Sequence, residues 1–246
     1  MSTRAFIARE PRMSVTGHLG ELRNRLIKSL IAVVLAFGVA WMFVDKIVFV
    51  LELPLLKALP AEARHLYFTG LTDKFLVYFR AALMTALVAT SPYWLAQIWL
   101  FVEPALSRRS GVTVFRFVFA ISATFISGVA FSYFFCLPYG CKFLVAFGGG
   151  SELPLITLAG YFEFILRGLV AMGLVFELPI LMQVLCALGM ADAKQFARRR
   201  PIAFFASSVA AAVIAPSPDL FSMLATMLPL YLLYELGIIA ARLTRG

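Results

Sequence analysis

Glu177 occupies a place in this sequence where an acidic side chain is unusual. It lies in the segment Phe176-Glu177-Leu178-Pro179, deep within a long apolar run. An ionised carboxylate at the centre of a membrane-spanning helix costs roughly 2.5–3.5 kcal/mol on insertion scales, so such a residue is a candidate for function. Pro179 frees a backbone carbonyl one turn earlier and should kink the helix, which would shape a recess that admits water. A structural glutamate, hydrogen-bonded to another span, is the alternative interpretation.

A second carboxylate, Glu21, lies in a segment that reads H-L-G-E-L-R-N-R-L from position 18 to position 26. Its three leucines recur at helical spacing, which predicts an amphipathic helix entering a membrane. Glu21 and Arg25 are four residues apart and could pair along one helix face. A solvated face with no binding role is the alternative for this segment taken alone.

Motifs of enzymes and metal sites are absent from the sequence. There is no glycine-rich phosphate loop, no G-x-S-x-G and no cluster with metal-ligand spacing, so we expect no enzymatic activity, no cofactor and no metal. His18 and His65 are predicted to be isolated. The three cysteines lie in or beside apolar runs and are expected to act as small apolar side chains: Cys136, Cys141 and Cys186.

The composition predicts an integral membrane protein. Hydrophobic residues make up 62% of the 246 residues and charged residues 14%, whereas soluble domains have roughly 45–50% and about 25%. The formal charge of +9 does not indicate a nucleic-acid partner, because most Lys and Arg lie in short clusters beside apolar runs. No cleavable signal peptide is expected, since the N-terminal run is polar and basic.

Apolar runs predict an all-α polytopic bundle that crosses the bilayer six times as one membrane domain, 1–246. The tail 1–26 should be cytoplasmic, and the spans are expected at about 26–44, 75–102, 114–138, 161–188, 201–215 and 220–241. The fifth span is the short one, because the fourteen residues from 202 to 215 cover only about 21 Å of a core of roughly 30 Å. It could be a re-entrant hairpin with the sixth span, or the two could be short helices in a thinned bilayer.

Basic residues set the expected orientation. Fifteen Lys and Arg fall on the side of the two termini, and five fall on the other side, where the long 45–73 loop also carries acids. Basic residues are retained on the cytoplasmic side, so both termini are expected inside. Arg80 and Arg167 lie within apolar runs, one to two turns from the outer helix ends, where snorkelling to the headgroups accounts for them.

A series of different short motifs extends along nearly the whole chain. After the segment 18–26 come four blocks: Ser91-Pro92 with Gln97, Trp99, Phe101 and Pro104-Ala105-Leu106; Gly128, Phe131, Tyr133, Phe134 and Pro138; Gly173 with Phe176 to Pro179; and Arg199-Arg200-Pro201, Pro218-Asp219 and Tyr234-Glu235. Together these blocks resemble those of the TatC family, the twin-arginine protein translocase subunit. The resemblance implies a concave bundle of six helices, with two short helices at the C-terminus, in the bacterial cytoplasmic (inner) membrane.

The resemblance also implies a function. TatC-type proteins bind twin-arginine signal peptides and, with TatA- and TatB-type single-span proteins, export folded precursor proteins using the proton gradient. An arginine pair needs carboxylates at the cytoplasmic face, since guanidinium groups bind them in bidentate fashion. The residues implied for signal-peptide binding are Glu21, Arg23, Gln97, Phe101 and Glu103. Glu177, Pro179 and Asp219 are implied as an intramembrane polar site for partner helices, in a complex expected to be oligomeric.

Departures from the family pattern keep alternatives open. Ser110 stands where the family usually has an acid, and Ser217 and Met223 replace a proline and a glutamine. Either Glu103 takes the anionic role of the missing acid or signal recognition is altered. The alternatives are a proton- or ion-coupled secondary transporter that uses Glu177, and a scaffold without receptor activity.

Overall fold

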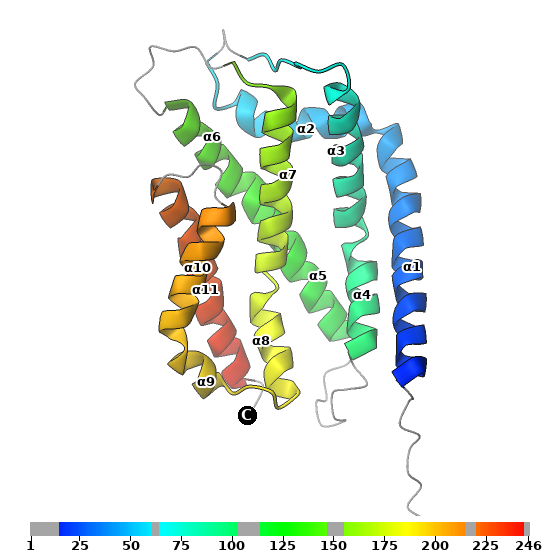
Figure 1. Cartoon of the computed structure of the whole chain (residues 1–246), viewed down its shortest axis with the longest axis vertical. Helices are drawn as coiled ribbons and strands as arrows, with labels where there is room; N and C mark the ends of the chain where they lie inside the picture. Colours follow the sequence, from blue (N-terminus) through cyan, green and yellow to red (C-terminus); the bar gives the residue numbers. More distant parts are fainter. Residues whose placement is uncertain (1–14, 61–63, 103–113, 147–154, 215–219, 244–246) are drawn as a thin grey trace, which may run out of the picture.

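The computed structural model describes residues 15–60, 64–102, 114–146, 155–214 and 220–243. Within these ranges the chain is mainly helical, and the only strand-like feature is an isolated bridge between Tyr67 and Thr157. Figure 1 shows an elongated bundle whose described ends, at the start of α1 and the end of α11, lie at the same end of the molecule. The all-α fold class is therefore confirmed.

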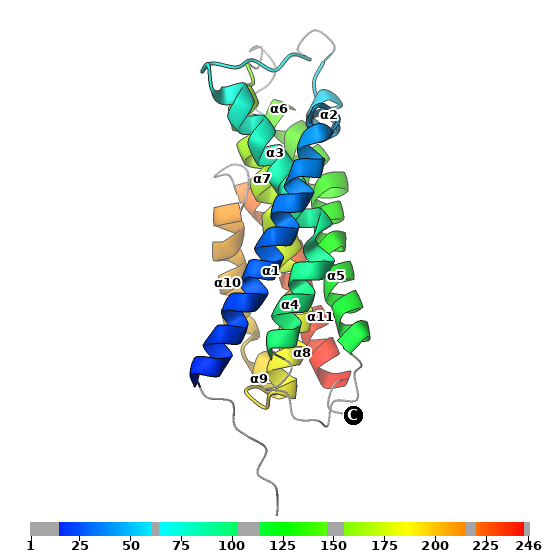
Figure 2. The same cartoon turned by 90° about the vertical axis from the view of Figure 1, so that its right-hand side faces the viewer.

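The first two helices form an arm and a cap. Helix α1 (Val15–Met42) runs along the edge of the bundle, and α2 (Val44–Leu56) lies across the opposite end of it (Figures 1 and 2). The long 45–73 connection, expected to be a loop, thus begins with a helix. Helix α2 forms because Val48 and Leu55 bury their side chains in the main hydrophobic core at this end.

Pro54 within α2 explains one hydrogen bond that fastens the cap. A proline has no N–H, so the carbonyl of Val50, four residues earlier, loses its helical donor. The hydroxyl of Tyr133 donates to that carbonyl at 2.6 Å, and the hydroxyl of Tyr161 donates to the neighbouring carbonyl of Leu51 at 2.7 Å. Two tyrosines from other helices therefore hold α2 on the bundle.

The second long apolar run folds as two helices rather than one. Helix α3 (Asp73–Ala89) and helix α4 (Ser91–Val102) meet at a bend of 56°. Pro92 lies in the first turn of α4, where its missing N–H costs no helical hydrogen bond but prevents α3 from continuing. Asp73, the first residue of α3, holds the turn before the helix by accepting hydrogen bonds from the backbone N–H groups of Gly70 (2.7 Å) and Thr69 (3.1 Å).

The middle of the chain supplies the central helices. Helix α5 (Val114–Phe131) passes through a π-helical turn (Ser132–Cys136) into α6 (Leu137–Ala146). Helix α7 (Leu158–Val175) is followed by α8 (Leu178–Ala187), with the break at Phe176 and Glu177 just before Pro179. Gly128 of α5 lies so close to α7 that a Cβ placed on it would be 2.5 Å from the carbonyl oxygen of Met172. Glycine is therefore required where α5 and α7 cross.

The C-terminal helices pack beside α8. After the short α9 (Ala193–Arg198), α10 (Arg200–Ile214) and α11 (Leu220–Leu243) form an antiparallel pair that ends short of the α2 end (Figure 1). Arg200 joins the pair at its base, since its Nε and Nη2 donate to the two carboxylate oxygens of Glu235 at 2.8 Å each. Helix α10 has 15 residues and α11 has 24.

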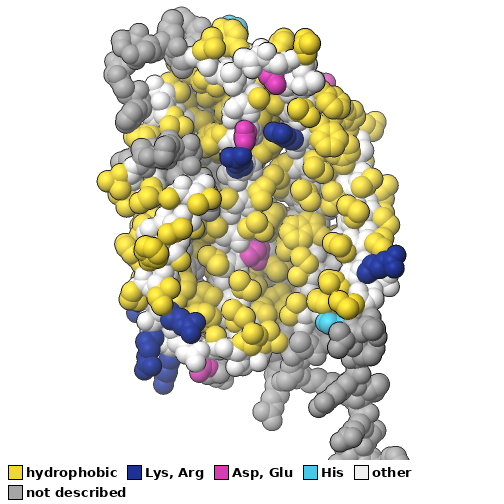
Figure 3. Space-filling model, in the orientation of Figure 1, with side chains coloured by type: hydrophobic (Ala, Val, Ile, Leu, Met, Phe, Trp, Pro, Cys, Tyr) yellow, Lys and Arg dark blue, Asp and Glu magenta, His cyan; other side chains and the backbone are white. Residues whose placement is uncertain are grey.

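The surface is that of a membrane protein. Large apolar side chains such as Leu26, Leu30 and Leu35 are exposed along α1, the last at 68%, and Figure 3 shows apolar side chains covering most of one face. Three described helical segments are long and apolar enough to cross a membrane, Gly17–Met42, Phe115–Ala146 and Leu158–Ala187, and the bent pair α3–α4 makes a fourth if it counts as one span. The count of six crossings stays a prediction.

Candidate functional site

One cluster of polar side chains lies where the beginning of α1 meets the end of α4. Glu21 and Arg25 lie on the same face of α1, one turn apart, and Arg25 donates from Nε to Glu21 Oε1 at 2.9 Å and also from Nη2 to the same oxygen. The remaining terminal nitrogen, Nη1, donates to Gln97 Oε1 on α4 at 3.3 Å. The guanidinium thus bridges two helices through residues that are 72 positions apart in the sequence.

An aromatic contact borders this cluster. The ring of His18 stacks on the ring of Phe101, with centroids 4.2 Å apart and planes 13° from parallel, and His18 Nδ1 lies 3.9 Å from Glu21 Oε2. The prediction that His18 is isolated was wrong, because α1 packs against α4 and brings Phe101 over the ring. Its place three residues before Glu21, at the start of the family-like segment 18–26, could have indicated this role. Glu21, Arg25, Gln97, Phe101 and His18 are therefore one site, called here the α1–α4 cluster.

The other residues predicted for this site are not part of the α1–α4 cluster as the structure describes it. Arg23 is exposed on α1 and has no hydrogen bond or ion pair with any residue that the structure describes. Glu103 and Ser110 lie outside the described residues. That Glu103 takes the anionic role of the acid missing at Ser110 therefore stays a prediction, as does its alternative, an altered signal recognition. The cluster as described holds one carboxylate, Glu21, whose side chain is 24% exposed.

A second polar site lies at the break between α7 and α8. Glu177 is half-buried there, and the hydroxyl of Thr124 on α5 donates to its Oε1 at 3.1 Å. That hydroxyl also lies 2.9 Å from the carbonyl of Ala120, and its single hydrogen can serve one acceptor at a time. Glu177 Oε2 is buried and has no hydrogen-bond partner among the described residues.

This arrangement leaves Glu177 with unused hydrogen-bonding capacity in an apolar setting. A buried polar oxygen without a partner costs free energy, so a polar group arriving from outside would bind to it favourably. Pro179 lies in the first turn of α8, and the helical pattern breaks just before it, as the sequence predicts. Asp219, expected to belong to the same intramembrane site, lies outside the described residues. No group of three metal-binding side chains occurs among the residues described.

Comparison with known proteins identifies the family. Residues 17–229 match the family model of the Sec-independent protein translocase protein (TatC). The chain belongs to the TatC family. The TatC protein of Desulforapulum autotrophicum is 33% identical over 95% of this chain and 86% of its own length, and that of Listeria innocua is 36% identical over 96% and 94%. The TatC protein of Escherichia coli is 29% identical over 93% and 88%.

Solved structures of the family agree with the fold. The crystal structure of the twin-arginine translocase receptor TatC has a TM-score of 0.81 and 31% sequence identity, and the match covers 93% of this chain and all of that one. A second crystal structure of this receptor, in the detergent DDM, has a TM-score of 0.82 over 91% of this chain. As a TatC-family member, the chain is a membrane protein and a component of the Tat protein-transport system. These comparisons do not favour a secondary transporter that uses Glu177.

Proposed function

We propose that this protein is the receptor for twin-arginine signal peptides and the core subunit of a translocase that exports folded proteins across the bacterial cytoplasmic membrane, driven by the proton gradient. Membership of the TatC family supports this proposal, as does the match to crystal structures of the twin-arginine translocase receptor. In this proposal both termini are cytoplasmic, which places the α1–α4 cluster on the side where precursors arrive.

The observation that carries the proposal is that Glu21 already binds a guanidinium. The α1–α4 cluster holds Arg25 against Glu21 Oε1 and Gln97 Oε1. Among the described residues, the second carboxylate oxygen, Oε2, has only the distant Nδ1 of His18 near it, at 3.9 Å. An arginine of a signal peptide would bind Oε2, or replace Arg25 on Oε1, through the same charge-assisted geometry. Glu103 is proposed to bind the second arginine of the pair.

The neighbouring residues are proposed to shape the binding surface. Phe101, already stacked on His18, offers an aromatic face beside the carboxylate, and guanidinium groups stack well on such faces. Arg23 is exposed on α1 and is proposed to contact the peptide backbone or an acidic residue of the precursor. The binding of an arginine pair then depends on Glu21 and Glu103, while Gln97, Phe101 and Arg23 position it.

Glu177 is proposed as a contact for partner helices. TatA- and TatB-type single-span proteins would bring a polar group to the buried, unpartnered Oε2 of Glu177 at the break before Pro179. Asp219 is proposed to extend this site near the tip of the last two helices. The working complex is then an oligomer of several chains and partners.

The test is binding of a purified twin-arginine precursor to the full chain with a photo-crosslinker at Leu22, which is exposed on α1. Glu21→Gln should lower the affinity about tenfold, because one charge-assisted contact is lost, and changing Arg-Arg to Lys-Lys in the precursor should lower crosslinking to Leu22. Glu52→Gln, at the opposite end of the bundle in α2, is the matched control and should bind as the wild type. Undiminished binding by Glu21→Gln, together with unchanged crosslinking of the Lys-Lys precursor, would contradict the receptor proposal.

A further inference from the structure

A hollow between α3 and α7 holds charged side chains in otherwise apolar surroundings. The pocket has a volume of about 770 Å³, and its lining includes Arg80 of α3 and the pair Glu163 and Arg167 of α7. Figure 3 shows a small group of acidic and basic side chains on a face that is otherwise mostly apolar. This hollow, called here the α3–α7 groove, is separate from the α1–α4 cluster and shares no residue with the Glu177 site.

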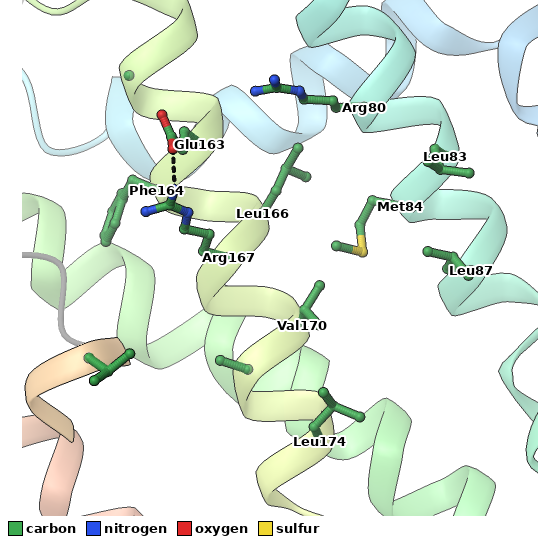
Figure 4. A pocket seen from close by; sticks show the side chains of 13 residues that line it. Arg80, Leu83, Met84, Leu87, Glu163, Phe164, Leu166, Arg167, Val170 and Leu174 are labelled. Carbon is green, nitrogen blue, oxygen red and sulfur yellow. Dashed lines mark hydrogen bonds and ion pairs between the residues drawn. The ribbon is translucent and has the colours of Figure 1, made fainter. Parts of the chain in front are cut away.

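The charges in the groove do not cancel. Glu163 and Arg167 form an ion pair along α7, and these side chains are 49% and 78% exposed. Arg80 extends from α3 toward them (Figure 4) and has no hydrogen bond or ion pair within the described part of the chain. Two guanidinium groups and one carboxylate leave a charge of about +1. In a lipid environment such a charge needs an anionic partner, since water is scarce there.

Each arginine lies at the end nearer α2 of an apolar stripe on its helix, and the two stripes extend in the same direction. On α3, Leu83 and Leu87 follow Arg80 at helical spacing, and on α7, Val170 and Leu174 follow Arg167 in the same manner (Figure 4). The two helices run parallel from the α2 end of the bundle (Figure 1). The groove is therefore polar at one end and apolar along its length, in the direction from the membrane surface toward its midplane.

The depth of the arginines fits a lipid headgroup. Arg80 is seven residues from the start of α3 and Arg167 nine residues from the start of α7, which places them roughly 10–14 Å along their helices. Long arginine side chains at this depth reach up to the boundary of headgroups and acyl chains. A phosphodiester at that boundary would bind both Arg80 and the guanidinium N–H groups of Arg167 that do not pair with Glu163.

We propose that the α3–α7 groove binds one anionic phospholipid, whose phosphate is held by Arg80 and Arg167 and whose acyl chain lies along Leu83, Leu87, Val170 and Leu174. The guanidinium group suits this task, because its planar fork of donors matches phosphate oxygens. Phosphatidylglycerol carries a net charge of about −1, which balances the groove. Phosphatidylethanolamine brings an amine that the surplus positive charge would repel, and Glu163 is already occupied by Arg167.

Native mass spectrometry of the full chain in detergent, with defined lipid added, tests the proposal. We expect the wild type to retain phosphatidylglycerol over phosphatidylethanolamine. Arg80→Gln/Arg167→Gln should reduce that retention about a hundredfold, because two charge-assisted contacts worth about tenfold each are lost. Lys57→Gln/Lys142→Gln removes two exposed basic residues elsewhere toward the α2 end and is the matched control. Equal retention of the two lipids, or an equal loss in the control, would overturn the proposal.

A gain of binding gives a second readout that misfolding cannot imitate. Glu163→Gln removes the carboxylate that competes for Arg167, so phosphatidylglycerol should bind severalfold more tightly than to the wild type. Unchanged or weaker binding by Glu163→Gln would mean that the three side chains serve only one another. Loss of a partner protein from Arg80→Gln/Arg167→Gln without any loss of lipid would also overturn the proposal and assign the groove to a protein ligand.

Discussion

Glu177 offers a prediction at the scale of a single residue, because a role in stability and a role in binding have opposite consequences. Its Oε2 is buried without a partner among the described residues, so Glu177→Leu should leave the melting temperature of the isolated chain unchanged or raise it. The same substitution should reduce co-purification of single-span partners severalfold. Thermal unfolding in detergent and pull-down from membranes measure the two effects.

Thr124→Val is the matched control for Glu177→Leu. It removes the hydroxyl that donates to Glu177 Oε1 but leaves the carboxyl in place, so partners should still be retained. A lower melting temperature for Glu177→Leu, with partners retained, would assign Glu177 to the fold instead of to binding.

Asp73 provides a pH-dependent prediction outside the spanning segments. Backbone hydrogen bonds from Gly70 and Thr69 hold the pKa of this carboxyl below its usual value of 3.8. A carboxylate with a depressed pKa stabilises the folded turn above its ordinary pKa, and this contribution is lost as the pH falls through the lower, folded value. Acidification from pH 7 to pH 5 should therefore leave the turn before α3 intact, and opening should begin below about pH 4.

Hydrogen exchange at residues 69–73 measures this opening, with Asp73→Asn compared at each pH so that intrinsic exchange chemistry cancels. The variant should show the open turn at every pH, and the wild type should approach it only in acid. Equal protection of the two proteins at pH 7 would show that the carboxylate does not hold the turn.

The residues of the α1–α4 cluster show how far sequence reasoning reaches at this scale. The pair Glu21 and Arg25 follows from their helical spacing, because that geometry is local. Gln97 and Phe101 were predicted only through the family resemblance. Their contacts with α1 depend on how α1 and α4 pack, and Gln97 is 72 positions from its partner Arg25. His18 was missed for the same reason, because its partner ring lies on α4.

At the scale of helices, the crossing of α5 and α7 gives the sharpest prediction. A Cβ on Gly128 would lie 2.5 Å from the Met172 carbonyl and 2.8 Å from Phe176 Cβ, whereas nothing lies within 4 Å of one on Gly38 in α1. Gly128→Ala should therefore force the helices apart and destabilise the protein by about 1–3 kcal/mol. Gly38→Ala should leave stability unchanged or slightly raise it.

Thermal unfolding of the two glycine variants in one detergent checks the comparison. Because both substitutions add a single methyl group to a helix, the difference between them isolates the close approach of α5 to α7. Equal melting temperatures would mean that the crossing can relax without cost.

The elements themselves were largely predictable where apolar runs are long. The runs around 26–44 and 161–188 contain helices because only helices satisfy the backbone within a membrane. Helix α2 was not predicted, since its amphipathic thirteen residues lie in a charged connection and owe their structure to burial against other helices. The bend before Pro92 was not predicted, although the proline itself signals a helix boundary. The π-helical turn at 132–136 depends on packing that a single run of sequence does not reveal.

At the scale of the whole molecule, charge and architecture agree on one arrangement. The described ends of the chain lie at the same end of the bundle (Figure 1), as an even number of crossings requires. Fifteen basic residues belong to the segments expected at that end and five to those at the α2 end. Helix α10 has only 15 residues, about 22 Å of rise, so it would span only where the bilayer is locally thinned.

Cysteine labelling in whole cells tests this topology. In a chain whose native cysteines are replaced by alanine, Lys57→Cys and Lys142→Cys, both exposed near the α2 end, should react with a maleimide that cannot cross the membrane. Lys194→Cys, exposed at the start of α9, should react only after the cells are opened, because the positive-inside rule places that connection in the cytoplasm. Reaction of Lys194→Cys in intact cells would reverse the orientation, and with it the α1–α4 cluster would face away from incoming precursors and could not receive their signal peptides.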